Sequence, residues 1–130
     1  MALHTLGREL GSALHLDAVA AVSAGRGAVT FDTPVAVLIP DEHGLAVRAV
    51  SPSGFAPGAA ELAVAKWALE HGRLAGSGTD TLPGSALTCV PLRLGSQTLG
   101  VLALRPQAPG PLSTEQRDFL LAFARQVAFA

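Results

Sequence analysis

The chain has 130 residues, of which 49% are hydrophobic and 15% charged, and nine basic residues nearly balance ten acidic ones. A chain of this length and composition is expected to fold as one domain that buries about two thirds of its unfolded surface, which excludes a disordered tail. The near-zero net charge and the lack of a basic run argue against a nucleic-acid partner held through its phosphates.

The cysteine count and the hydropathy pattern exclude further classes of protein. Cys89 is the only cysteine, so an internal disulfide and a multi-cysteine zinc site are excluded, and a reducing compartment is favoured. No apolar run approaches the ~18 residues of a membrane span. His4, Arg8 and Glu9 interrupt the N-terminal pattern, which is therefore not that of a signal peptide.

Leucines recur at three- and four-residue steps near the start of the chain, at Leu3, Leu6, Leu10 and Leu14. This period predicts an amphipathic helix. Gly11–Ser12 and residues 15–17 are expected to divide it into two helices, with Asp17 capping the second. Arg26–Gly27 is the expected end of the pair.

Residues 34–39 and 45–50 are aliphatic runs on either side of a polar turn that ends in Gly44. This pattern predicts a β-hairpin. The first run is apolar on both faces, so its strand is expected in a sheet that is covered on both sides.

Residues 59–72 predict a helix that is rich in alanine, carries Glu61 in its first turn and ends at Gly72. Its polar residues Lys66 and Glu70 form one narrow stripe, so most of its circumference is expected to be buried. Residues 87–94 and 98–105 predict a second hairpin. Pro91 lacks an N–H, so an irregular or unpaired side is expected beside it.

The last segment, residues 112–130, has Ser113 and Gln116 at the spacing of a capping box and so predicts a helix. Five apolar residues are expected on one side of it: Leu112, Phe119, Leu120, Phe123 and Val127. The helix has no C-cap, which suggests that it continues in a longer protein. The whole order predicts an α+β fold, an antiparallel sheet sandwiched by helices in a single domain over residues 1–130.

This order of elements resembles the GAF domain, a sensory module related in shape to PAS domains. Residues 65–85 and 91–104 resemble the GAF region of the KdpD family of potassium-responsive sensor histidine kinases, most specifically at Trp67, His71–Gly72 and residues 76–83. The resemblance implies a cytoplasmic domain of a membrane protein, placed between transmembrane helices and a kinase that passes phosphoryl groups to a response regulator and controls potassium uptake.

The function expected from this resemblance is signal relay. An N-terminal helix would receive motion from the membrane and the C-terminal helix would pass it to the kinase dimer. Leu3, Leu6 and Leu10, with Phe119, Phe123 and Val127, are expected to form the helical contact, within the domain or across a homodimer.

The polar loop within residues 73–86 is the candidate ligand site. Its hydroxyls, carbonyls and one carboxylate are hard oxygen ligands suited to a cation such as potassium, and its glycine N–H groups can instead form an anion nest. The alternative is that the same residues only satisfy a turn. Trp67 either stacks on a ligand or belongs to the core. The candidate residues are Trp67, Gly76, Ser77, Gly78, Thr79, Asp80 and Thr81.

Catalysis, metal binding and a cofactor are not expected in this chain. It has no G-x-S-x-G elbow and no P-loop lysine, and its four histidines are isolated in the sequence. A redox enzyme that uses Cys89 is the remaining alternative. Because one thiol has no neighbour to resolve its sulfenic acid, a buried and inert Cys89 is favoured.

Overall fold

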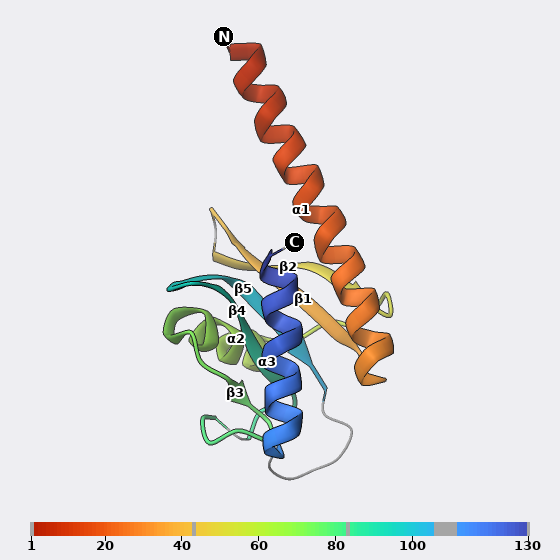
Figure 1. Cartoon of the computed structure of the whole chain (residues 1–130), viewed down its shortest axis with the longest axis vertical. Coiled ribbons are helices and arrows are strands. Elements are labelled where there is room, and N and C mark those ends of the chain that lie inside the picture. The colour runs from red at the N-terminus through yellow and green to blue at the C-terminus, as the bar shows by residue number, and fades with distance from the viewer. Residues whose placement is uncertain (1, 43, 83, 106–111, 130) are drawn as a thin grey trace.

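The computed structural model describes residues 2–42, 44–82, 84–105 and 112–129, and only the backbone of residues 2–15. The elements are α1 (Ala2–Phe31), β1 (Val35–Asp41), β2 (Gly44–Ser51), α2 (Ala59–His71), β3 (Ala75–Gly76), β4 (Thr88–Leu94), β5 (Gln97–Leu104) and α3 (Thr114–Phe129). The strands form one sheet in the order β2-β1-β5-β4-β3, with antiparallel neighbours (Figure 1). The predicted α+β sandwich and both predicted hairpins are confirmed.

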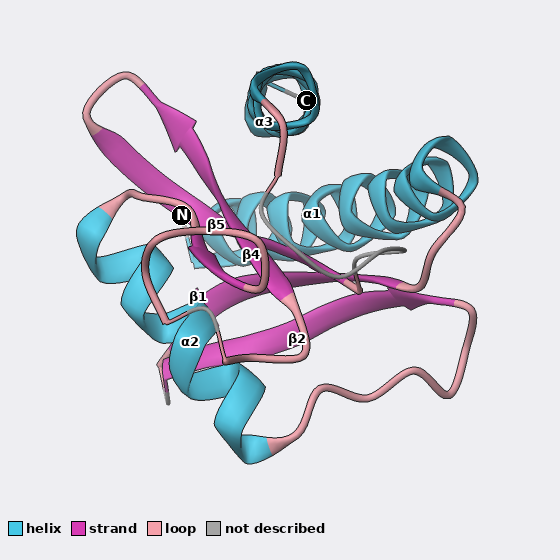
Figure 2. Cartoon of the chain, turned by 90° about the horizontal axis from the view of Figure 1, so that it is seen from below, coloured by secondary structure: helices cyan, strands magenta, loops and turns pink. Residues whose placement is uncertain are grey.

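Helices cover both faces of this sheet. Figure 2 shows α1 and α3 on one face and α2 on the other. Helix α1 packs on β1 and β2, α3 packs on β4, and α2 packs on β3, β4 and β5. Of the helices in the described part of the chain, none combines the length and the apolar composition that crossing a bilayer requires.

Strand β1 shows why the sheet needs both covers. All side chains from Val35 to Leu38 are buried, and they alternate between the two faces. Val35 and Val37 belong to the terminal-helix core, which contains Ala20, Ala24, Val90, Leu92, Leu102, Leu104, Leu120, Ala124 and Ala128 as well. Ala36 and Leu38 belong to the α2 core, with Val64, Ala65, Ala68, Ala75, Leu87, Cys89, Val101 and Ala103. The expectation of a strand covered on both sides is confirmed.

Helix α1 is one unbroken helix, so the predicted division at Gly11–Ser12 and residues 15–17 is wrong, as is the predicted end at Arg26–Gly27. A glycine in a helix costs only about 1 kcal/mol. That cost is offset because Ala20 and Ala24 anchor the following turns in the terminal-helix core. Asp17 lies within the helix and does not cap a helix start. Its Oδ1 forms an ion pair with Nη1 of Arg48 on β2 at 3.1 Å.

Helix α2 begins at Ala59 and ends where Gly72 adopts a left-handed conformation, with φ at +63°. Both ends agree with the prediction, but the expected burial of most of the circumference is wrong. Only Val64, Ala65 and Ala68 are buried, and alanines elsewhere on the helix are exposed. Alanine favours helices because of its low side-chain entropy cost, which does not require burial.

Two local predictions on the later elements are confirmed. Strand β3 pairs only with Thr88 and Cys89 of β4, so Pro91 has no partner strand on that side. At the start of α3, the Ser113 N–H donates to Oε1 of Gln116 at 2.9 Å, and the Gln116 N–H donates to Oγ of Ser113 at 3.1 Å. This reciprocal pair is a capping box.

Candidate functional site

The predicted ligand loop begins where β3 ends. Gly76 has φ at +97°, and a Cβ at this position would overlap the carbonyl oxygen of Leu87. The conformation and the close backbone approach both require glycine. The hydroxyl oxygen of buried Thr79 lies 2.8 Å from the carbonyl oxygens of Gly76 and Thr81, between which it shares its single proton.

Backbone hydrogen bonds close the same loop. The Gly76 N–H donates to the Thr81 carbonyl at 2.8 Å, and the Thr81 N–H donates to the Thr79 hydroxyl at 3.2 Å. The Ser77 N–H donates to Leu87 at 3.0 Å, which fastens the loop to the segment before β4. These bonds are those of a turn that satisfies its own polar groups, and Asp80 is exposed. Ligand binding by residues 76–81 therefore stays a prediction.

Two contacts of this loop were not predicted from the sequence. Thr88 is fully buried at the start of β4, and its hydroxyl donates to the Ser77 carbonyl at 2.6 Å. The Leu112 N–H, just before α3, donates to the Gly78 carbonyl at 2.9 Å. A threonine within an apolar strand is the signal for the first contact. The second joins residues far apart in the chain and has no local signal.

Trp67 is half-buried on α2 and packs against the α2 core. Its ring stacks on that of His71, with centroids 4.1 Å apart and planes 13° apart. Nδ1 of His71 donates to the Trp67 carbonyl at 2.9 Å, which holds the imidazole in this position. The imidazole therefore already occupies one face of the indole. A role of Trp67 in ligand stacking stays a prediction.

Cys89 is fully buried in the α2 core. Burial, with a smaller contribution from the negative charge of Glu61, raises the pKa of its thiol to about 12. The thiol is neutral and shielded, as the expectation of an inert cysteine requires. In the described part of the chain, no three His, Cys, Asp or Glu side chains come together in a way that would hold a metal ion.

The terminal helices meet through aromatic rings. The ring of Phe31 on α1 lies 5.4 Å from that of Phe119 and 5.3 Å from that of Phe123, both on α3. Phe123 and Val127 pack against the terminal-helix core as predicted, whereas Phe119 is 55% exposed. The side chains of Leu3, Leu6 and Leu10, predicted for the same contact, lie outside the described residues.

An open groove runs between the two terminal helices beside these rings. It has a volume of about 630 Å³ and is lined by Gly25, Arg26, Val29, Thr30, Phe119, Phe123 and Gln126. Val29, which lines the groove on the side of α1, is 83% exposed. The face formed by α1 and α3 thus presents large apolar side chains to solvent, which is typical of an interaction surface.

Comparison with known families identifies the family to which this fold belongs. The family model of the GAF domain matches residues 15–130. The chain belongs to the GAF domain family. This GAF domain is 36% identical over 113 residues to the sensor protein KdpD of Escherichia coli (strain K12), an alignment that covers 86% of the chain and 12% of that protein.

Solved structures give the same result. The native GAF domain of the potassium sensor histidine kinase KdpD from Escherichia coli matches with a TM-score of 0.68 and 34% identity, over 85% of this chain and 77% of that one. The GAF domain of an Acinetobacter phosphoenolpyruvate-protein phosphotransferase matches with a TM-score of 0.64 and 15% identity, over 99% and 91% of the two chains. The second match shows the shared fold alone. The first supports a KdpD-like GAF domain.

Proposed function

We propose that this GAF domain is the signal-relay module of a KdpD-like two-component sensor histidine kinase that controls potassium uptake. The chain spans 12% of KdpD, the curated relative that it matches, so the kinase activity belongs to other parts of the proposed parent. In this proposal the parent is a membrane protein, the module lies in the cytoplasm as a single domain, and a response regulator receives the phosphoryl group. The likeness to KdpD, a potassium sensor histidine kinase, supports a parent of this kind.

The observation that carries the relay is that α1 and α3 share one face of the sheet. Movement of α1 changes its packing on β1 and β2, and the sheet transmits this change to α3, which packs on β4. The direct contact of Phe31 with Phe119 and Phe123 offers a second route. Two packings that differ by a few kcal/mol suffice for a switch.

The same face is the proposed homodimer contact. Val22, Val29, Phe119 and Phe129 are between 55% and 83% exposed on α1 and α3. A second copy of the face would cover them, and its hydrophobic burial would drive association. The flanking transmembrane and kinase segments of the proposed parent would continue from the two helices.

Alanine substitutions test this role. Phe119→Ala with Phe123→Ala is expected to weaken dimerisation in sedimentation equilibrium and to alter autophosphorylation of the full-length kinase. Leu94→Ala, which removes a 41% exposed side chain at the β4–β5 turn, serves as the control and is expected to change neither. Unchanged dimerisation and kinase output in the double variant would rule out the relay through these rings.

A receptor that binds a small molecule or an ion through residues 76–83 and Trp67 is the second candidate. The observation that favours it is the hydrogen bond from the Leu112 N–H to Gly78, which connects this loop to the start of α3. A ligand raises the melting temperature through mass action. Melts in potassium, in sodium and with cyclic nucleotides are expected to differ. Identical melts in all of them would eliminate this candidate.

A further inference from the structure

A second groove lies between the sheet edge and α3, and its lining shares no residue with the candidate residues 76–81 or with the Phe119 groove. It has a volume of about 350 Å³ and is lined by Gly72, Arg73, Leu74, Pro91, Arg93, Leu121 and Arg125. These residues come from the segment between α2 and β3, from β4 and from α3. Small-molecule sites begin at about this size.

The charge of this groove differs from that of the chain. Three of the nine basic residues line it, and none of the ten acidic residues does. Within the described residues, none of the three guanidinium groups forms an ion pair. Like charges that line one hollow repel one another, and an anion placed between Arg93 and Arg125 relieves that repulsion.

Arg93 is placed by the end of α2. Its Nη1 donates to the Gly72 carbonyl at 3.5 Å, a long bond that uses one of the five N–H donors of a guanidinium. A Cβ at Gly72 would lie 3.3 Å from Cζ and Nε of Arg93, so glycine at this helix end leaves room for the guanidinium. No other hydrogen bond to a described residue engages the Arg93 guanidinium, so its remaining donors can face a ligand.

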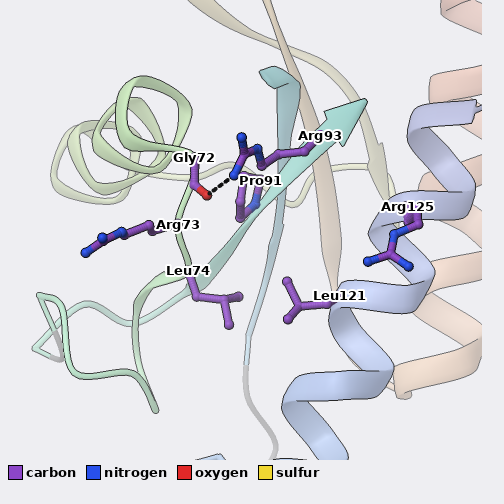
Figure 3. A pocket seen from close by; sticks show the side chains of 7 residues that line it. All are labelled: Gly72, Arg73, Leu74, Pro91, Arg93, Leu121 and Arg125. Atoms are coloured by element: carbon purple, nitrogen blue, oxygen red, sulfur yellow. Dashed lines mark hydrogen bonds between the residues drawn. The ribbon is translucent and has the colours of Figure 1, made fainter. Parts of the chain in front are cut away.

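The groove combines these charges with an apolar floor. Figure 3 shows Leu74 and Leu121 pointing toward each other across it, with Arg93 on the β4 side and Arg125 on the α3 side. The side chain of Arg73 points away from the other two at the rim. Pro91 completes the floor below Arg93. A ligand that fits this arrangement is part anion and part apolar body.

We propose that this groove binds a small organic phosphate, with the phosphoryl oxygens on Arg93 and Arg125 and the organic part on Leu74, Pro91 and Leu121. A phosphate monoester carries close to two charges at neutral pH and three acceptor oxygens, which matches the two guanidinium groups of Arg93 and Arg125 better than a carboxylate with one charge does. Binding would tie α3 to the edge of the sheet. The inference concerns binding alone and does not depend on the relay.

Calorimetric titration of the domain with phenyl phosphate, inorganic phosphate and benzoate tests the proposal. Phenyl phosphate is expected to bind one per chain, and at least about tenfold more tightly than either of the others, because only it combines the phosphate with an apolar body. No saturable binding up to about 10 mM, or equal affinity for all three anions, would overturn the proposal.

Charge-removing variants locate the site. Arg93→Gln and Arg125→Gln are each expected to weaken phenyl phosphate binding about tenfold, and Arg73→Gln less, because its side chain points away. Arg117→Gln is the matched control, because it removes the same charge from α3 about 12 Å along the helix axis from Arg125. Melting curves check that each variant is folded. Equal weakening in Arg117→Gln would indicate nonspecific attraction and would refute the site.

Discussion

The helices that cover the two faces of the sheet differ in how much apolar surface they leave exposed. On the α2 face, short side chains such as Ala65 and Ala68 let the helix lie against the strands, and both are at most 1% exposed. On the terminal-helix face, α1 and α3 bury Ala20, Ala24 and Leu120 but leave Val29 and Phe119 largely exposed. The difference indicates that α2 closes the domain, while α1 and α3 form a surface that is suited to further contacts.

Thiol labelling gives the largest expected difference between the faces. Cys89 in the α2 core is expected to react about a thousandfold more slowly than an exposed thiol at pH 8, because its pKa of about 12 leaves little thiolate. The comparison uses Phe119→Cys in a Cys89→Ala background, whose thiol lies on the exposed face. Mass spectrometry follows both rates. Fast labelling of Cys89 in the folded protein would show that α2 does not seal its face.

Leucine truncations compare the two cores directly. Leu38 faces the α2 core and Leu102 faces the terminal-helix core, and both are 0% exposed. Each change to alanine is expected to lower the free energy of unfolding by about 3 kcal/mol, because a buried cavity remains. Urea denaturation measures both. A much smaller loss for Leu102→Ala would mean that the terminal helices are loosely docked on the isolated domain.

Glycine substitutions in the loop between β3 and β4 test how tightly the α2 side of the sheet is packed. Gly76→Ala is expected to cost about 2 kcal/mol, because its φ of +97° is strained for alanine and the added Cβ overlaps the Leu87 carbonyl. Gly84→Ala in the same loop is the control, since a Cβ there meets no atom within 4 Å. Equal stability of the two variants would show that the turn at Gly76 can rearrange freely.

The smallest effect is expected for the ion pair between α1 and β2. Asp17 and Arg48 form it with side chains that are 54% and 32% exposed, so solvent screens it. Asp17→Asn is expected to cost at most about 0.5 kcal/mol, and less in high salt. Thermal melts at two salt concentrations check this. A larger and salt-independent loss would show that α1 depends on this contact for docking.

The sequence predicted the elements whose signals are local. Two aliphatic runs on either side of a polar turn at Gly44 predict the first hairpin, and Gly72 ends α2 because its left-handed conformation suits glycine. The break at Gly11–Ser12 was predicted wrongly, because a local glycine penalty is small beside the packing that holds α1 on the sheet. Two-residue β3 is too short for any periodicity.

The sites depended more on distant contacts. The hydroxyls and glycines of residues 76–81 are visible in the sequence, but only the structure shows that they bond to one another. Arg93 and Arg125 lie 32 positions apart, and no spacing rule relates a strand residue to a helix residue at that separation. Their common groove follows from the packing of α3 on β4.

The bond from the Leu112 N–H to the Gly78 carbonyl joins the turn after β3 to the foot of α3. The helix has 16 residues and is therefore about 24 Å long. A tilt of about 5° about this point displaces the far end by about 2 Å, given that helix length. A displacement of the turn after β3 that tilted α3 about this bond would therefore be enlarged at the last turn of the helix.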